Sequence, residues 1–265
     1  MIKAAVEKVR FTRKALTLIA HIIWGMVLIT LLGFWIPSRP NRFKRHVIQR
    51  WYQRACRILN LQLSVAGDIT RQPCLVVSNH ISWLDIIVIG SHIPVHFLSK
   101  AEVRQWPIIG WLAACTGTLF IQRGSGESAT MANTIANTIS SGDSVLVFPE
   151  ATSTDGKELK RFFPNMFAAV SKTNVPVQPL ALEYTEHKQR STSAPFINDN
   201  TFFRHLLLIL KNDHINVAIT FLPAIQNTPQ ADKKTLSINS RNAILSVIQP
   251  ISYDETTFQQ FATAH

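Results

Sequence analysis

The sequence predicts an α/β fold: a mixed, largely parallel sheet flanked by helices, with an N-terminal hydrophobic membrane helix. Three observations lead to this prediction. Short apolar runs typical of buried strands alternate with segments of helical periodicity. Apolar residues make up 46% of the 265 residues and charged residues only 16%, and the longest apolar run lies near the N-terminus with basic residues on both sides.

The alternation can be followed along the chain. The pattern predicts strands at 74–78, 95–99, 118–121, 144–148, 177–182 and 216–222, and helices at 82–90, 106–115, 128–141 and 231–248. In the helix at 128–141, Met131, Ile135 and Ile139 recur at every fourth position and form one face. Because strands that alternate with helices pair mostly in parallel, the sheet is expected to be largely parallel.

The N-terminal apolar run starts at Ala15 and ends at Ile36. As a helix it would be about 33 Å long, close to the thickness of a bilayer core. It is too long for the apolar region of a signal peptide, and no small-x-small cleavage site follows it. Two alternatives remain open: a helix that spans the membrane, or one that enters a single leaflet and returns. We expect residues 1–50 to form the anchoring segment and residues 51–265 the rest of the protein.

The charge predicts an anionic partner. The formal net charge is +11, from 27 Lys and Arg against 16 Asp and Glu. The basic residues flank the apolar run, which favours an anionic membrane surface over nucleic acid. Three cysteines without C-x-x-C spacing, Cys56, Cys74 and Cys115, indicate neither a disulfide framework nor a zinc site and fit the cytoplasmic face of a membrane, such as an inner membrane.

A histidine and an aspartate follow the strand at 74–78, in the block Asn79-His80-Ile81-Ser82-Trp83-Leu84-Asp85. On one continuous helix His80 and Asp85 would point about 140° apart. They meet only if His80 lies in the turn before the helix and Asp85 in its first turn. Asp85 would then fix the imidazole tautomer and leave the other ring nitrogen as a general base. The alternative is a polar cluster, including Asn79 and Ser82, that only closes the turn.

Other polar residues follow neighbouring strands. Glu150 comes after the strand at 144–148, in Phe148-Pro149-Glu150-Ala151-Thr152, and would either bind a substrate hydroxyl or brace the loop. Lys100 and Arg123 also stand at strand ends, where two cations would form a phosphate or carboxylate pocket. No pair of histidines forms a convincing metal-ligand motif, so no metal site is predicted.

These blocks resemble those of the glycerolipid acyltransferases, best known as 1-acylglycerol-3-phosphate acyltransferases. The similar segments are 79–85 (N-H-x-x-x-x-D), Lys100 with 106–110, 117–123 (G-x-x-F-I-x-R), 148–150 (F-P-E) and 175–179 (V-P-x-x-P). The resemblance implies that His80 is the general base and Asp85 its partner. It also implies that Arg123 and Glu150 help to bind the acceptor, and that the donor is acyl-CoA or acyl carrier protein. Pro149 and Thr152 are expected to support the site, and no cofactor is expected.

The third block departs from the family pattern. It reads E-A-T-S where the family usually has E-G-T-R, so Ser153 replaces a phosphate-binding arginine. Lys157 or Arg161 would have to substitute if the acceptor is 1-acylglycerol-3-phosphate, the favoured lysolipid. The run at 152–156 resembles, more weakly, the acyltransferases that complete ornithine lipids, so lyso-ornithine lipid is the alternative acceptor. A catalytically inactive lipid-binding protein is the non-enzyme alternative.

Overall fold

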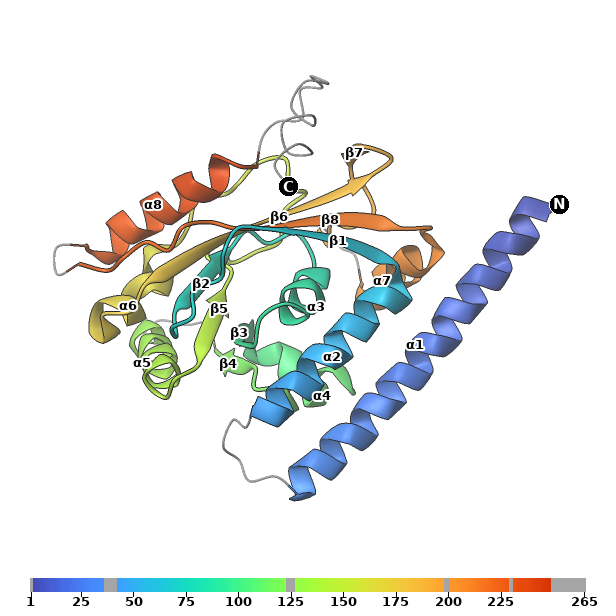
Figure 1. Cartoon of the computed structure of the whole chain (residues 1–265), viewed down its shortest axis with the longest axis horizontal. Helices are drawn as coiled ribbons and strands as arrows, with labels where there is room; N and C mark the ends of the chain where they lie inside the picture. Colours follow the sequence, from blue (N-terminus) through green and yellow to red (C-terminus); the bar gives the residue numbers. More distant parts are fainter. Residues whose placement is uncertain (1, 36–41, 123–126, 198–200, 229–230, 249–265) are drawn as a thin grey trace.

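The computed structural model describes residues 2–35, 42–122, 127–197, 201–228 and 231–248. Its centre is a sheet of eight strands in the order β1-β8-β6-β2-β5-β3-β4, with β7 paired to the end of β6 (Figure 1). The strands are β1 (Leu61–Ala66), β2 (Leu75–Ser78), β3 (Val95–Lys100), β4 (Leu119–Ile121), β5 (Ser144–Val147), β6 (Val177–Glu186), β7 (Gln189–Arg190) and β8 (Ile215–Phe221).

The direction of the strands determines where loops gather. Five neighbouring strands run parallel to one another, in the order β4, β3, β5, β2 and β6. β8 runs antiparallel to β6, and β1 pairs with β8 in parallel. The sheet is therefore mixed and largely parallel, as predicted. The carboxyl ends of the five parallel strands lie at one edge, where sites of open α/β sheets form.

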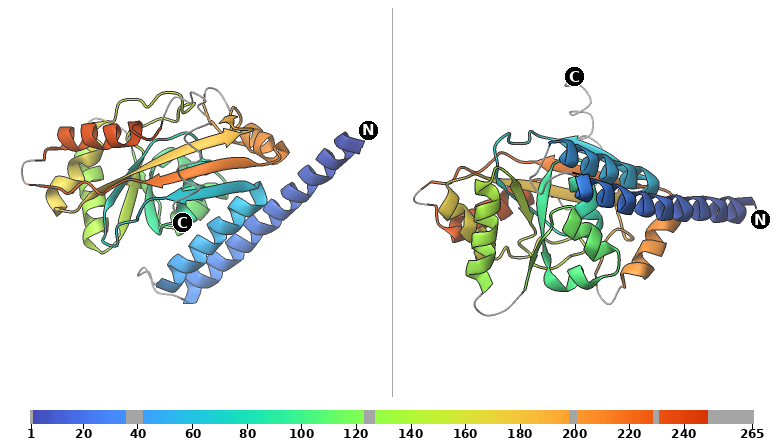
Figure 2. Two further views of the ribbon diagram at one scale, coloured as in Figure 1. Left: turned by 45° about the horizontal axis from the view of Figure 1, so that its top comes forward. Right: turned by 90° about the horizontal axis from the view of Figure 1, so that it is seen from below.

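Helices cover both faces of the sheet (Figures 1 and 2). The core on one face includes residues of α2 (Arg42–Leu59), α3 (Leu84–Gly90) and α7 (Phe202–Lys211). The core on the other includes residues of α5 (Glu127–Ser140), α6 (Ala168–Thr173) and α8 (Lys233–Leu245). The remaining helices are α1 (Ile2–Trp35), α4 (Ile109–Cys115) and the 3₁₀ helices η1 (Ala101–Gln105) and η2 (Pro164–Phe167).

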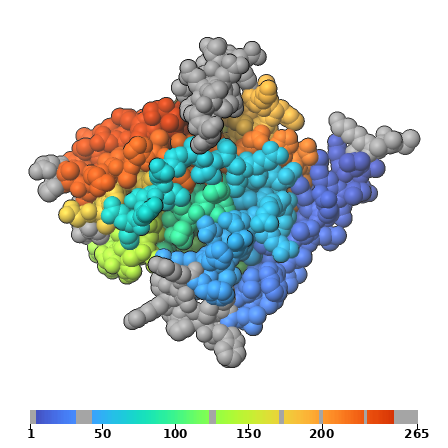
Figure 3. Space-filling model, viewed as in Figure 1, coloured from blue at the N-terminus to red at the C-terminus, as the bar shows by residue number. Residues whose placement is uncertain are grey.

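The long helix α1 packs along the outside of this layer. It contacts α2, α4 and α7, and it lies against α2 on one side of the molecule (Figure 3). Two polar side chains on its inner face are buried. The Lys14 Nζ donates to the carbonyl oxygens of Leu59 (3.3 Å) and Asn212 (2.8 Å), and the His21 ring stacks on Trp51 with centroids 4.6 Å apart. Its stretch Ala5–Leu31 is long and apolar enough to cross a membrane by length and composition.

The predicted strands and helices are present, with instructive differences. The helix predicted at 106–115 begins only at Ile109, because Ile108 has φ +63° and the Ile109 N–H donates to the Pro107 carbonyl oxygen (2.6 Å). This three-residue γ-turn is strained for a β-branched side chain. β6 continues four residues past the predicted end at 182. The boundary predicted between residues 50 and 51 falls inside α2.

Candidate active site

The polar block after β2 forms a strand–turn–helix unit. β2 ends at Ser78, His80 lies in the turn, and Asp85 lies in the first turn of α3. The His80 Nδ1 is 2.8 Å from the Asp85 Oδ2. Because a carboxylate only accepts, Nδ1 carries the proton, and the neutral ring keeps Nε2 as an acceptor. The side chain of His80 is 24% exposed, whereas that of Asp85 is fully buried.

Further hydrogen bonds hold the Asp85 carboxylate in place. Its Oδ2 also accepts from the backbone N–H groups of Ile81 (2.8 Å) and Ser82 (3.0 Å). Its Oδ1 accepts from the Tyr184 hydroxyl at 2.7 Å. All three donors stabilise the ionised carboxylate. The arrangement therefore aims one fixed negative charge at the Nδ1 of His80.

Sequence reasoning missed Tyr184, because it ended this strand at residue 182. In the longer β6, Tyr184 faces the same side as Leu182 and Leu180, since alternate residues of a strand share a face. Its ring is buried, and burial, followed by the neighbouring Asp85 charge, raises the pKa of Tyr184 well above its ordinary value. The phenol is therefore a permanent donor to Asp85.

Glu150 joins the turn that contains His80 to the next loop. Its Oε1 accepts from the His80 N–H (2.8 Å) and its Oε2 from the Lys160 N–H (2.9 Å). Burial raises the pKa of Glu150, and these two N–H donors act against that rise. Since both oxygens bond to backbone, the carboxylate braces the two loops. From the same strand end, the Phe148 ring stacks on His80 with centroids 4.1 Å apart.

Asn79 and Thr154 fix the turn from two sides. The Asn79 Nδ2 donates to the Leu182 carbonyl oxygen (2.9 Å), and the Leu182 N–H donates to the Asn79 Oδ1 (2.8 Å). The Thr154 N–H donates to the His80 carbonyl oxygen (2.8 Å). The Ser82 Oγ is buried and has no hydrogen-bond partner within the described part of the chain. His80 is thus held through its backbone as well as its ring.

His80 opens onto a cavity of about 460 Å³, within the size range of small-molecule sites. Most of its lining is apolar, and α1, α2, α3 and α4 all contribute to it, through Leu28, Ile48, Ile86 and Leu112 among others. The floor near His80 is formed by Phe148 and the loop at 151–153. An apolar space of this kind, ending at an imidazole, suits a long hydrocarbon chain whose reactive end lies at the ring.

The predicted binding residues are distributed unevenly around this cavity. Lys100 and Thr152 line it, and Lys100 is the one lysine or arginine among the described lining residues. Ser153 also lines it, and its Oγ donates to the Phe196 carbonyl oxygen. Arg161 lies away from the lining, exposed, with its guanidinium 5.6 Å from the Phe163 ring centroid. Arg123 lies outside the described residues. Pro149 takes part through its carbonyl oxygen, which accepts from the Phe163 N–H (2.9 Å).

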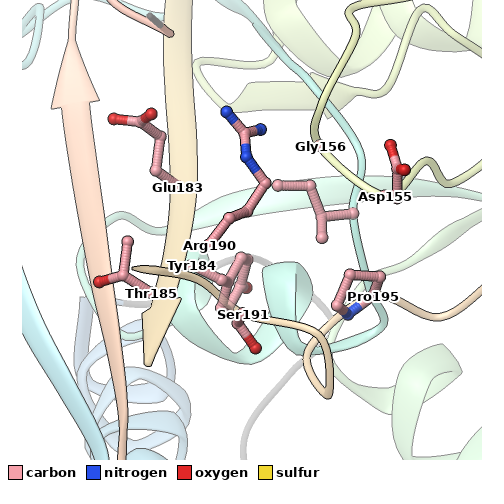
Figure 4. A pocket seen from close by; sticks show the side chains of 9 residues that line it. Asp155, Gly156, Glu183, Tyr184, Thr185, Arg190, Ser191 and Pro195 are labelled. Carbon is pink, nitrogen blue, oxygen red and sulfur yellow. The ribbon is translucent and has the colours of Figure 1, made fainter. Parts of the chain in front are cut away.

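A smaller recess is lined by Ile81 and by residues of β6, β7 and the loop at 155–156 (Figure 4). Asp155, Glu183 and Arg190 bring charge to its lining. Its volume is about 10 Å³, roughly the space of one water molecule. The Phe196 N–H donates to the Ile81 carbonyl oxygen (2.9 Å), which helps to close the wall between this recess and His80. Of these two spaces, only the cavity that His80 lines is large enough for a substrate, and it is therefore the candidate substrate site.

Comparison with known proteins identifies the class. Residues 60–183 match the family model described as Acyltransferase. The chain is 36% identical over 228 residues to the lyso-ornithine lipid O-acyltransferase of Pseudomonas aeruginosa, covering 83% of this chain and 88% of that protein. The chain therefore belongs to the acyltransferase family and is an O-acyltransferase.

Two other comparisons concern a further relative and a solved structure. The 1-acyl-sn-glycerol-3-phosphate acyltransferase of Neisseria gonorrhoeae is 27% identical over 193 residues, covering 72% of this chain and 76% of that protein. The crystal structure of the 1-acyl-sn-glycerophosphate acyltransferase PlsC from Thermotoga maritima superimposes with a TM-score of 0.69 at 18% identity, covering 94% of this chain and 96% of that one. The last comparison confirms the predicted fold.

Proposed function

We propose that this protein transfers a fatty acyl group from an acyl thioester to the free hydroxyl of a lysolipid, with His80 as general base and Asp85 as its partner. The observation that carries the proposal is that two features meet at His80. A buried carboxylate lies 2.8 Å from His80, and the ring lines a large apolar cavity. A hydroxyl and an acyl chain can therefore meet at the base, as general base catalysis requires.

In the proposed transfer step, His80 is the only proton carrier. The Nε2 takes the proton of the acceptor hydroxyl while its oxygen attacks the thioester carbonyl carbon, which forms a C–O bond. The tetrahedral intermediate then collapses, the C–S bond breaks, and the leaving thiolate takes the proton from the imidazolium. Asp85 stabilises the imidazolium between these events. The step uses neither a metal ion nor a redox cofactor.

For the acceptor we favour lyso-ornithine lipid. Its ornithine headgroup carries a carboxylate and an amine and no phosphate. In the described lining, Lys100 is the one lysine or arginine, and Ser153 stands where family members bind phosphate through arginine. The 36% identity to a lyso-ornithine lipid enzyme supports the same assignment. The 27% identity to a 1-acyl-sn-glycerol-3-phosphate enzyme, together with Lys100, keeps 1-acylglycerol-3-phosphate as the second candidate.

The remaining partners follow from the same proposal. The donor is acyl-CoA or acyl carrier protein, and the enzyme works at the cytoplasmic face of a membrane. For α1 we favour insertion into one leaflet over a complete span. Lys14 and His21 hold its inner face against the α/β layer, so a spanning α1 would have to give up these contacts.

The acceptor is tested by offering both lysolipids side by side. Purified protein in detergent receives a long-chain acyl thioester with lyso-ornithine lipid or lysophosphatidic acid, and ester product is measured by mass spectrometry. We expect transfer to lyso-ornithine lipid, and we expect Ser153→Arg to shift the preference toward lysophosphatidic acid. Wild-type transfer to lysophosphatidic acid alone would reject our choice of acceptor. Transfer to neither lysolipid would reject both candidate acceptors.

A further inference from the structure

The γ-turn before α4 forces an apolar side chain into solvent. With φ +63°, Ile108 projects outward and is 49% exposed. The backbone at Gly110 packs closely against η1, because a Cβ on Gly110 would lie 2.3 Å from the Arg104 carbonyl oxygen. The strained turn therefore keeps a close approach between α4 and η1, with Ile108 at its tip.

Other large apolar side chains surround this tip. Trp106 and Trp111 are 38% and 43% exposed, and Phe203 on α7 is 67% exposed. The Trp106 ring lies 5.7 Å from that of Phe202, next to Phe203 in sequence. We call Trp106, Ile108, Trp111 and Phe203 the aromatic patch. An exposed apolar group of this kind marks a contact surface.

The aromatic patch continues the outer face of α1. Both α4 and α7 contact α1, and the three helices are seen together in the right view of Figure 2. The outer face of α1 exposes its own apolar side chains, including Ile19, Ile23, Trp24 and Val27. Trp106 and Phe202 also line the cavity that contains His80. The patch thus borders that cavity through Trp106, next to α1.

Basic residues accompany the apolar ones. Arg104 is exposed and lies over the Phe120 ring, 5.6 Å from its centroid. Arg204 is exposed and follows Phe203. Tryptophan, phenylalanine and isoleucine beside arginine are typical of surfaces that enter the interface of an anionic bilayer.

We infer that the aromatic patch is a second membrane-contact surface, separate from α1, which inserts into the interfacial region of an anionic bilayer. The inference rests on the membrane association proposed above and adds a contact made by the α/β layer itself. With α1 on one side and the aromatic patch on the other, the cavity rim would face the lipid from which an acceptor enters.

Spin labels on the full chain test this directly. All variants carry Cys115→Ser, because the other two cysteines are buried. Nitroxides are attached at Ile108→Cys, at Ile23→Cys on α1, and at Ile238→Cys on α8. Ile238 is a matched control, since it is 48% exposed and lies on the helix far from α1 (Figure 1). Accessibility to oxygen and to a water-soluble nickel chelate is measured with and without phosphatidylcholine–phosphatidylglycerol vesicles.

We expect vesicles to protect the labels at 108 and 23 from nickel and to leave the label at 238 unchanged. If the label at 23 is protected and the label at 108 is not, the aromatic patch does not touch the membrane. Protection of neither label also overturns the inference.

Activity provides a second readout. We expect Ile108→Asp to lower transfer to an acceptor embedded in vesicles by about tenfold, whereas Ile238→Asp leaves it unchanged. Both variants should resemble wild type with the acceptor in detergent. If the wild-type protein is active in detergent but the label at 108 does not insert, this inference is rejected and the proposed function stands. If the wild-type protein shows no transfer at all, the proposed function is rejected.

Discussion

Replacing Asp85 by asparagine removes a negative charge from beneath His80 while keeping the shape of the turn. The asparagine Oδ1 can take the place of the Oδ2 that accepts from His80, Ile81 and Ser82. Its Nδ2 then faces the Tyr184 hydroxyl, which can rotate and accept. We therefore expect the variant to fold and to lose most of its turnover.

The size of the loss follows from the geometry. The Asp85 oxygen and the His80 nitrogen are 2.8 Å apart, so the centres of the two charges lie about 4 Å apart when the imidazolium forms. At an effective dielectric constant of about 20, such a pair is worth about 4 kcal/mol. If this stabilisation is lost only in the transition state, kcat falls about 10³-fold.

The assay is acyl transfer in detergent, followed by mass spectrometry of the ester product at saturating acceptor. Thermal unfolding of the same preparation shows whether the variant is folded. A folded Asp85→Asn protein with kcat within tenfold of wild type would refute the assignment of His80 and Asp85. His80→Ala is the companion variant, and we expect its loss to be at least as large, because it removes the base itself.

Three further changes test the surroundings of the site. Tyr184→Phe leaves the Asp85 Oδ1 without its hydroxyl donor, so we expect kcat to fall about tenfold with KM unchanged; an unchanged kcat would show that the hydroxyl is dispensable. Ala151 has φ +59°, so Ala151→Gly should relieve about 1 kcal/mol of left-handed strain and raise Tm by about 2–4 °C; a lower Tm would contradict this. Burial lowers the pKa of His205 below 6.5, and its Nδ1 accepts from the Trp83 indole (2.8 Å). Below pH 6.5, His205 takes up a proton more readily in the unfolded chain than in the folded chain. As the pH is lowered through this range, His205 should therefore decrease the free energy of unfolding by at most about 1.4 kcal/mol per pH unit. Denaturant titrations across this range should show a shallower fall in His205→Gln, and equal slopes would exclude His205.

Local sequence patterns were sufficient to predict much of the sheet. The strands at β2, β5 and β8 are short apolar runs between turn residues, and their predicted bounds agree with the structure within one residue at each end. The helix after β2 was also predictable, and with it the only geometry in which His80 and Asp85 can meet. Both depend on residues within a few positions of one another, where backbone geometry limits the possibilities.

Longer-range features escaped the sequence for identifiable reasons. α7 was not predicted. Its residues Ile209 and Leu210 are buried only because the helix packs against the sheet. Tyr184 looked unremarkable because its partner, Asp85, is 99 positions away. The role of Glu150 depended on two backbone N–H groups, one of which, from His80, is 70 positions away.

The sequence alone thus determined the class of fold, the pairing of His80 with Asp85, and the apolar, positively charged N-terminal segment, because each depends on residues close together in the sequence. Only the tertiary structure decided which side of α1 faces the protein, what holds the Asp85 carboxylate, and where the apolar cavity ends. Those outcomes depend on contacts between segments far apart in the chain, and the energy of a contact is set by the burial and distance that folding creates.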